Sequence, residues 1–231
     1  ARVIQEVRRG YGAALQAGVT AARGEIIVMA DADDSYDWGD IGSFVDKIDE
    51  GFDLVMGNRF KGGIEPGAMP PLHRYLGNPV LSFVSRVVFR APIGDFHCGM
   101  RAFRREAYAR MNLQTTGMEF ATEMVASSAH NGLRIAEIPI RLYPDKRDRP
   151  PHLRSFRDGW RHLRFIVTYA PDHLYLWPGV ITLGIGLLLQ AILAFGPARI
   201  FGAYLGLHFL VLGGFLSILG LNALFMGTLA K

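Results

Sequence analysis

The chain has 231 residues, half of them hydrophobic, and a formal net charge of +4 at pH 7. This length is sufficient for one folded domain with an additional segment. The single cysteine, Cys98, excludes an intramolecular disulfide and a zinc site built from several cysteines. Residues 25–53 hold ten Asp and Glu, whereas residues 141–164 hold eight Lys and Arg, which suggests separate sites for a cation and for an anion.

The first sixty residues alternate between short apolar runs and helical patterns. The expected elements are a strand end at residues 2–7, a helix at 11–22, a strand at 26–30, a helix at 38–50 and a strand at 53–57. Strands that alternate with helices in this way predict an α/β domain with a parallel, doubly wound sheet.

The expected strand at residues 26–30 runs directly into Asp31, Ala32 and Asp33. Alternate residues of an extended chain point the same way, so the carboxylates of Asp31 and Asp33 can converge just beyond the strand. Two close carboxylates repel each other unless a cation or hydrogen-bond donors lie between them. A divalent ion would satisfy the pair and could also hold substrate phosphates. An acidic turn that caps a helix is the alternative interpretation.

The second half of the domain adds helices expected at residues 72–89, 106–111 and 118–131, and a strand at 133–140. A further helix is expected at residues 155–169, with Phe156, Trp160, Leu163 and Val167 on one face and arginines on the adjacent stripe. This pattern predicts a helix that lies in a membrane interface. A basic surface helix packed on the domain is the alternative.

The C-terminal part is strongly apolar. Residues 174–195 and 200–230 contain no Asp, Glu, Lys or Arg, and each stretch is long enough to cross a bilayer. The short linker at 196–199 predicts a transmembrane hairpin, and the basic residues before it place the domain in the cytoplasm. The sequence thus predicts an integral membrane protein with three parts: an α/β domain at 1–154, an amphipathic interfacial helix at 155–172, and a membrane hairpin at 173–231.

Five motifs precede this hairpin: Arg-Gly-Tyr-Gly-Ala-Ala-Leu (9–15), Asp-Ala-Asp-Asp-Ser-Tyr-Asp (31–37), Gly-Asn-Arg-Phe (57–60), Asp-Phe-His-Cys-Gly-Met-Arg (95–101) and Arg-Pro-Pro-His-Leu-Arg-Ser (149–155). In this order they resemble family-two glycosyltransferases of the GT-A type. The particular resemblance is to polyprenyl-phosphate sugar synthases such as dolichyl-phosphate mannose and glucose synthases. It implies a GT-A, Rossmann-like domain. The family's first strand has no counterpart here, so we expect the domain to be incomplete at its N-terminal side.

The resemblance implies that Asp31 and Asp33 bind Mg²⁺ or Mn²⁺ together with the diphosphate of a nucleotide sugar. Arg59 matches the arginine of a substrate-binding segment of the family. Arg101 matches the arginine of its acceptor loop and is grouped with the catalytic residues, as is Asp95.

Further substrate contacts are implied for Arg149, Arg154 and Ser155, which match the family's basic phosphate-binding element. Asp95 is a candidate for positioning the sugar or the acceptor, and capping a turn is its alternative role. Glu119, one helical turn from a second glutamate, is a candidate sugar contact, with a solvated helix face as the alternative.

The resemblance implies transfer of a sugar, with glucose favoured, from a nucleoside-diphosphate sugar to a polyprenyl phosphate, with inversion. A phosphate nucleophile is already ionised at neutral pH and requires positioning by cations rather than a base. The alternatives are transfer to a glycolipid or polysaccharide hydroxyl, and an inactive membrane-anchored scaffold. Nucleic-acid binding is not expected, because the basic run borders the bilayer and lacks stacking aromatics. The expected location is a bacterial or archaeal plasma membrane. The sequence does not decide between a monomer and a homo-oligomer.

Overall fold

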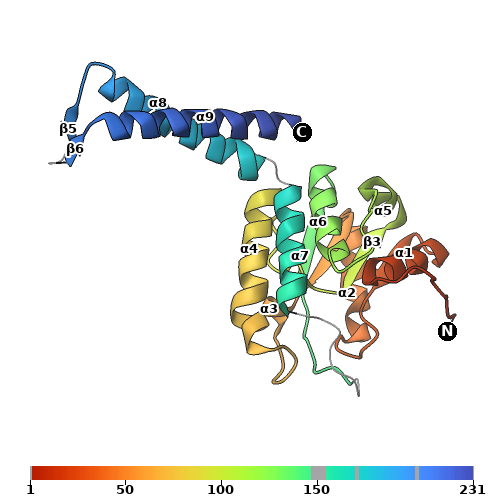
Figure 1. The fold of residues 1–231 in the computed structure, drawn as a ribbon. Coiled ribbons are helices and arrows are strands. Elements are labelled where there is room, and N and C mark those ends of the chain that lie inside the picture. Colours follow the sequence, from red (N-terminus) through yellow and green to blue (C-terminus); the bar gives the residue numbers. More distant parts are fainter. Residues whose placement is uncertain (1, 147–154, 170–171, 201–202, 231) are drawn as a thin grey trace. The chain divides into compact units, whose positions relative to one another are not determined.

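The computed structural model describes residues 2–146, 155–169, 172–200 and 203–230. The chain forms two compact units, Ala1–Ile166 and Val167–Lys231, and each is described by itself (Figure 1). Residues 2–7, all of them described, form no strand, so the strand end expected there is a wrong prediction.

The first unit is built on a four-stranded mixed sheet. Its strands are β1 (Ile26–Met29), β2 (Leu54–Asn58), β3 (Arg101–Arg104) and β4 (Ile135–Pro139). They lie in the order β1-β3-β2-β4, with β3 antiparallel to both neighbours and β2 parallel to β4. The α/β class is confirmed, but the expected wholly parallel sheet is wrong. The direction of the short strand β3 depends on where the preceding chain re-enters the sheet, which its own four residues do not encode.

The strand directions bring four loops together. Because β1, β2 and β4 all run opposite to β3, three strands end at the sheet edge where β3 begins. The loops that follow β1, β2 and β4 therefore meet the loop that precedes β3. In open α/β sheets, ligands bind at this kind of edge.

Helices cover both faces of this sheet. They are α1 (Tyr11–Ala21), α2 (Ile41–Asp49), α4 (Asn78–Phe89), α5 (Arg105–Met111), α6 (Phe120–His130) and α7 (Ser155–Thr168), together with one short turn of helix, α3 (Arg59–Gly62). Alternate residues of β2 enter different cores: Leu54 and Met56 pack in one cluster and Val55 in the other, all with no exposed surface. Because alternate residues of this strand face different cores, Leu54, Val55 and Met56 are all apolar.

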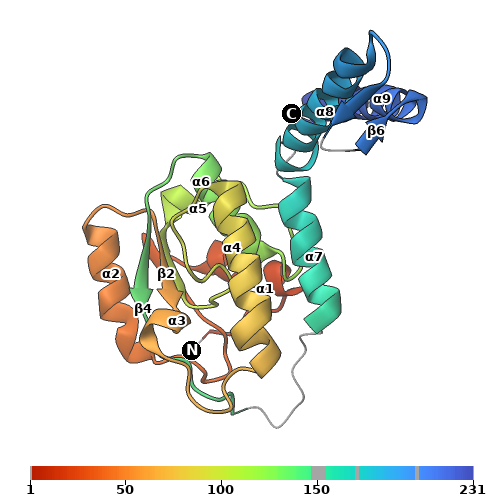
Figure 2. The ribbon, with the colours of Figure 1, turned by 90° about the vertical axis from the view of Figure 1, so that its left-hand side faces the viewer.

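The helix α7 confirms the helix expected from residue 155 onward. Its residues His162, Phe165 and Ile166 are buried, whereas Trp160 is 64% exposed. Figure 2 shows α7 and α4 on the side of the sheet away from α2. The helix thus has one face packed on the first unit and one face available to other contacts.

The second unit consists mainly of two apolar helices. The first is α8 (Trp177–Leu193), preceded by the helical turn η3 (Asp172–Leu176), and the second is α9 (Leu207–Leu229). The helical segments Asp172–Leu193 and Leu207–Leu229 are long and apolar enough to cross a membrane. The second helix begins at Leu207 rather than at residue 200, because the chain first forms the short pair β5 (Ala198–Ile200) and β6 (Ala203–Leu205).

Glycines allow α8 and α9 to approach closely. Side chains added at Gly186 and Gly220 would lie 2.5 Å and 2.4 Å from main-chain nitrogens of the opposite helix. Small residues at a helix–helix contact are typical of membrane proteins, where close backbone approach supplies much of the packing energy.

Candidate active site

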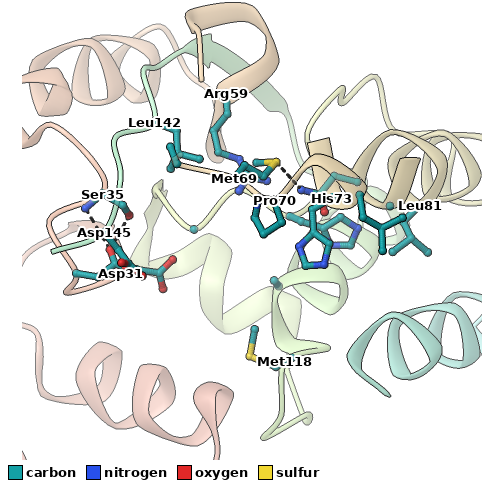
Figure 3. A pocket seen from close by; sticks show the side chains of 18 of the residues that line it. Asp31, Ser35, Arg59, Met69, Pro70, His73, Leu81, Met118, Leu142 and Asp145 are labelled. Carbon is teal, nitrogen blue, oxygen red and sulfur yellow. Dashed lines mark hydrogen bonds between the residues drawn. The ribbon is translucent and has the colours of Figure 1, made fainter. Parts of the chain in front are cut away.

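A cavity of about 450 Å³ lies within the first unit, where the loops at the sheet edge converge. Figure 3 shows its two sides. Asp31, Ser35 and Asp145 gather on one side, and His73 and Leu81 lie on the other, with Arg59 between them. The cavity is therefore acidic at one end and largely apolar at the other.

The acidic end contains the predicted pair. Asp31 and Asp33 both line the cavity, so the prediction that they share one site is consistent with the structure. Asp33 Oδ1 accepts hydrogen bonds from Ser35 N (3.2 Å) and Ser35 Oγ (2.5 Å), which fix the turn after β1. Asp31 Oδ2 occupies the space beside Gly99, where an added Cβ would lie 2.3 Å away. Burial and the nearby Asp31 carboxylate together raise the pKa of Tyr11, which also lines the cavity, well above its ordinary value.

The chain after β4 completes this end. Tyr143 N donates to Ser35 O (2.9 Å) and Lys146 N to Asp33 O (3.2 Å), so this segment runs along the acidic turn and brings Asp145 to the cavity. The next residues in the chain, 147–154, lie outside the described residues, and they include the predicted Arg149 and Arg154. Ser155 is the first residue of α7.

Arg59 and Asp95 form a buried ion pair behind the cavity. Arg59 Nε and Nη2 donate to the two Asp95 carboxylate oxygens at 2.7 Å and 2.8 Å, and Arg59 N donates at 3.2 Å. Asp95 has no exposed surface, whereas Arg59 is 8% exposed and lines the cavity. Burial alone would raise the pKa of Asp95, but the charge and hydrogen bonds of Arg59 hold it below its ordinary value. Asp95 therefore positions Arg59, and it is Arg59 that reaches the cavity.

Arg101 is not among the residues that line the cavity. Its guanidinium donates to the main-chain oxygens of Cys98 (2.8 Å), Phe96 (2.9 Å) and Ala121 (2.6 Å), and the residue has no exposed surface. Burial lowers the pKa of Arg101. In the structure this arginine ties the loop before β3 to α6, which is a supporting role, whereas the resemblance grouped it with the catalytic residues.

The two glutamates near α6 differ in their surroundings. Glu123 is 3% exposed and accepts hydrogen bonds from Gln114 N, Thr115 N and Thr115 Oγ1 at 2.6–2.9 Å, so it holds the preceding loop. Glu119 is half-buried, and its Oε2 has no hydrogen-bond partner among the described residues. Of the pair, Glu119 is thus the one that keeps an oxygen for another group.

The donor set of the acidic end suits a hard divalent cation shared with a phosphorylated ligand. Within the described ranges, no group of three or more His, Cys, Asp or Glu could hold a metal ion by itself. Mg²⁺ is commonly held by one or two carboxylates, with substrate phosphates and water as its other ligands. Asp31 and Asp33 fit this arrangement, provided that a diphosphate and water supply the remaining oxygens.

Sequence reasoning did not assign three of the residues that line the cavity to the site: His97, Asp145 and His162. His162 lines it from α7, together with His97 from the loop before β3. His97 stands beside Cys98 in one of the five motifs, but no spacing pattern in the sequence connects it with His162, which is 65 positions later. Asp145 was likewise invisible as a site residue, since its place depends on the pairing of two loops.

An α/β domain that has a carboxylate pair in a cavity at the carboxyl ends of its strands is typical of proteins that bind phosphorylated ligands. Residues 1–111 match the family model described as Glycosyl transferase family 2, and this part of the chain belongs to that family. This match confirms the family that the motifs predicted.

The chain is similar to two curated proteins of Haloferax volcanii. It is 39% identical to the "Low-salt glycan biosynthesis hexosyltransferase Agl6" over 227 residues, which cover 98% of this chain and 54% of that protein. It is 36% identical to a "Dolichyl-phosphate hexose transferase" over 141 residues, or 61% of this chain and 60% of that protein. The chain therefore spans little more than half the length of these relatives.

Among solved structures, glucosyl-3-phosphoglycerate synthase from Mycobacterium tuberculosis, in complex with phosphoglyceric acid, aligns with 71% of this chain and 55% of its own. The TM-score is 0.49 and the sequence identity is 20%.

Proposed function

We propose that this chain transfers a hexose from a nucleoside-diphosphate sugar to a polyprenyl phosphate at a membrane surface, with inversion and with Mg²⁺ or Mn²⁺. The main support is that Asp31, Asp33 and Arg59 line one cavity. The family, the relative named as a dolichyl-phosphate hexose transferase, and two helices long enough to cross a membrane support it further.

The donor diphosphate would lie at the acidic end of the cavity. A divalent ion held there by Asp31 and Asp33 would neutralise the charge that develops on the leaving diphosphate. Asp95 accepts hydrogen bonds from Nε and Nη2 of Arg59, and this ion pair fixes the orientation of the guanidinium. No described residue accepts a hydrogen bond from Nη1 of Arg59, which is therefore left to bind a ligand oxygen. The sugar would then be placed between the acidic end and the apolar end.

The surroundings of the carboxylates favour a phosphate acceptor over a hydroxyl acceptor. A hydroxyl nucleophile requires a base within hydrogen-bond reach. Asp95 and Glu123 are both bound within the protein. Glu119 has an oxygen without a partner among the described residues, but Glu119 is not among the residues that line the cavity. An ionised phosphate requires only cations, and Arg149, Arg154 and Ser155 are proposed to supply its site.

This acceptor site is tested by kinetics on Arg154→Ala. The variant should raise the KM for polyprenyl phosphate about tenfold or more and leave the KM for the nucleotide sugar within twofold, since a lost charged hydrogen bond is worth about 1.5–3 kcal/mol. Arg141→Ala, at an exposed arginine paired with Glu65, is the matched control. A defect confined to the donor KM would contradict the acceptor assignment.

We also propose that the first unit faces the cytoplasm. The support is the excess of basic residues in 141–164 over the single arginine in the turn between the two apolar helices. A reporter fused at the C-terminus should then be accessible only from the cytoplasm, and an external reporter would contradict this orientation.

A further inference from the structure

Two histidines from distant parts of the chain meet in the wall of the cavity. His97 and His162 both line it, and their rings make an edge contact with centroids 4.9 Å apart and planes at 69°. The pair joins the loop before β3 to α7. It lies outside the predicted carboxylate and arginine sites, and nothing in the mechanism above uses it.

His97 lines the cavity from the loop that joins Asp95 to Gly99. It lies two residues after Asp95, which holds Arg59, and two residues before Gly99, which packs against Asp31. The loop therefore runs from the arginine to the acidic end, and His97 lies on the stretch between them. A sugar that joins a diphosphate at the acidic end to an acceptor beyond Arg59 would pass this position.

His97 also has an unmet hydrogen-bonding requirement. Its Nε2 is buried and has no hydrogen-bond partner among the described residues. A buried polar nitrogen without a partner costs about 1–3 kcal/mol, and most such atoms in folded proteins have a partner, either protein or water. A ligand in the cavity that the ring lines would supply this partner.

The neutral form of the ring suits a hydroxyl ligand. Burial, the neighbouring His162 and two arginines lower the pKa of His97 to about 3, although Asp95 opposes them. A neutral imidazole has one donor and one acceptor nitrogen, which matches a hydroxyl group that both donates and accepts. Phosphate oxygens are better served by the arginines. Two histidines are also too few for a zinc site, and the described residues offer no third ligand.

His162 is held in place independently of any ligand. Its Nδ1 lies 2.9 Å from Thr122 Oγ1, both residues are buried, and His162 stands against the ring of His97. This contact restrains the plane of the His97 ring. The orientation of the ring thus depends on α6 and α7 together.

We infer that His97 hydrogen-bonds a hydroxyl of the transferred hexose and that His162, fixed by Thr122, positions His97 for this contact. The inference rests on the proposed function and assigns the sugar subsite of the same cavity. It makes His97 a specificity-determining residue and His162 a positioning residue. Through His162, recognition of the sugar depends on the seating of α7.

Binding measurements separate this subsite from the diphosphate site. With Mn²⁺ present, the purified full chain in detergent is titrated with UDP-glucose, UDP-galactose and GDP-mannose, and with UDP and GDP alone. If none of the sugars binds to the unaltered protein, the proposed function fails. Otherwise, His97→Phe should weaken binding of the accepted nucleotide sugar roughly tenfold, as expected for one hydrogen bond, and change binding of the free diphosphate less than twofold.

Deoxy analogues of the accepted donor identify the hydroxyl. In the unaltered protein, one monodeoxy analogue should bind roughly tenfold more weakly than the full nucleotide sugar. In His97→Phe, the same analogue and the full nucleotide sugar should bind equally well. The other analogues should lose affinity equally in both proteins. His130→Phe, at an exposed histidine on α6, is the matched control and should behave like the unaltered protein.

Further variants keep the inference open to refutation if His97→Phe does not fold. His97→Gln, which retains hydrogen-bonding groups, should recover part of the sugar affinity. Thr122→Val should raise the donor KM and leave the acceptor KM unchanged. The inference is overturned if every sugar and the free diphosphate weaken together, if only the acceptor KM changes, or if no deoxy analogue shows the paired loss.

Discussion

Replacing Asp95 with Asn removes the negative charge from the buried ion pair and keeps the size of the side chain. Both carboxylate oxygens are bound by Arg59 at 2.7 Å and 2.8 Å, and the two residues are 0% and 8% exposed. The variant therefore leaves a buried guanidinium without its counter-charge, which costs about 3–5 kcal/mol. For a domain of this size, each kcal/mol of lost stability lowers Tm by about 2–4 °C, so this cost corresponds to a loss of roughly 6–20 °C in Tm.

Thermal unfolding of the full chain in detergent measures this loss. Asp46→Asn, at an exposed residue of α2, is the control and should change Tm little. The double variant Arg59→Met with Asp95→Leu should regain much of the stability, because paired apolar groups replace the ion pair, and should stay inactive because Arg59 is absent. If Asp95→Asn lowered the free energy of unfolding by less than 1 kcal/mol and also abolished turnover, the reasoning would be refuted. That result would indicate that Asp95 acts directly in catalysis.

The same pair predicts a dependence of stability on acid. Arg59 lowers the pKa of Asp95 from its ordinary value of 3.8, so the contribution is present above that value and is lost as the pH falls through the lower folded value. Between pH 7 and pH 3, the unaltered protein should therefore lose part of its advantage in Tm over Asp95→Asn. An advantage that stays constant or grows toward pH 3 would contradict the sign of this shift.

Other variants probe the acidic end and the apolar helices. Asp33→Ala should abolish metal-dependent turnover, by at least a hundredfold, and unchanged turnover would remove the metal assignment. Gly99→Ala, whose Cβ would lie 2.3 Å from Asp31 Oδ2, should displace that carboxylate and weaken Mn²⁺-dependent binding of nucleoside diphosphate, with Tm nearly unchanged. Gly220→Ala should force α8 and α9 apart at a cost of about 1–3 kcal/mol, measured as a lower Tm, whereas Gly184→Ala, with nothing within 4 Å, should not.

Local patterns were sufficient to predict much of the first unit. β1 and the turn that follows it are encoded by a contiguous apolar run and by Asp31 and Asp33, so both the strand and the shared cavity could be anticipated. The helix α7 was predicted from its spacing of aromatic and basic residues. These features depend on neighbours a few positions apart in the chain.

Features that depend on distant contacts could not be predicted in the same way. The direction of β3 is decided by its pairing with β1 and β2. The motif that contains Arg101 suggested a catalytic role, but the burial of this side chain follows from its bonds to carbonyls on two separate segments. The meeting of His97 with His162 depends on where α7 packs, which no local pattern specifies.

Transfer of labelled sugar to lipid tests the proposed activity most directly. Membranes that contain the full chain are incubated with labelled nucleotide sugars and polyprenyl phosphate, with and without a chelator, and the lipid extract and the released nucleoside diphosphate are both quantified. The proposal predicts one sugar in the lipid fraction for each diphosphate released, loss of both with chelator, and recovery with Mn²⁺ or Mg²⁺. Sugar transferred equally well to polyprenol, or no transfer from any donor, would contradict it.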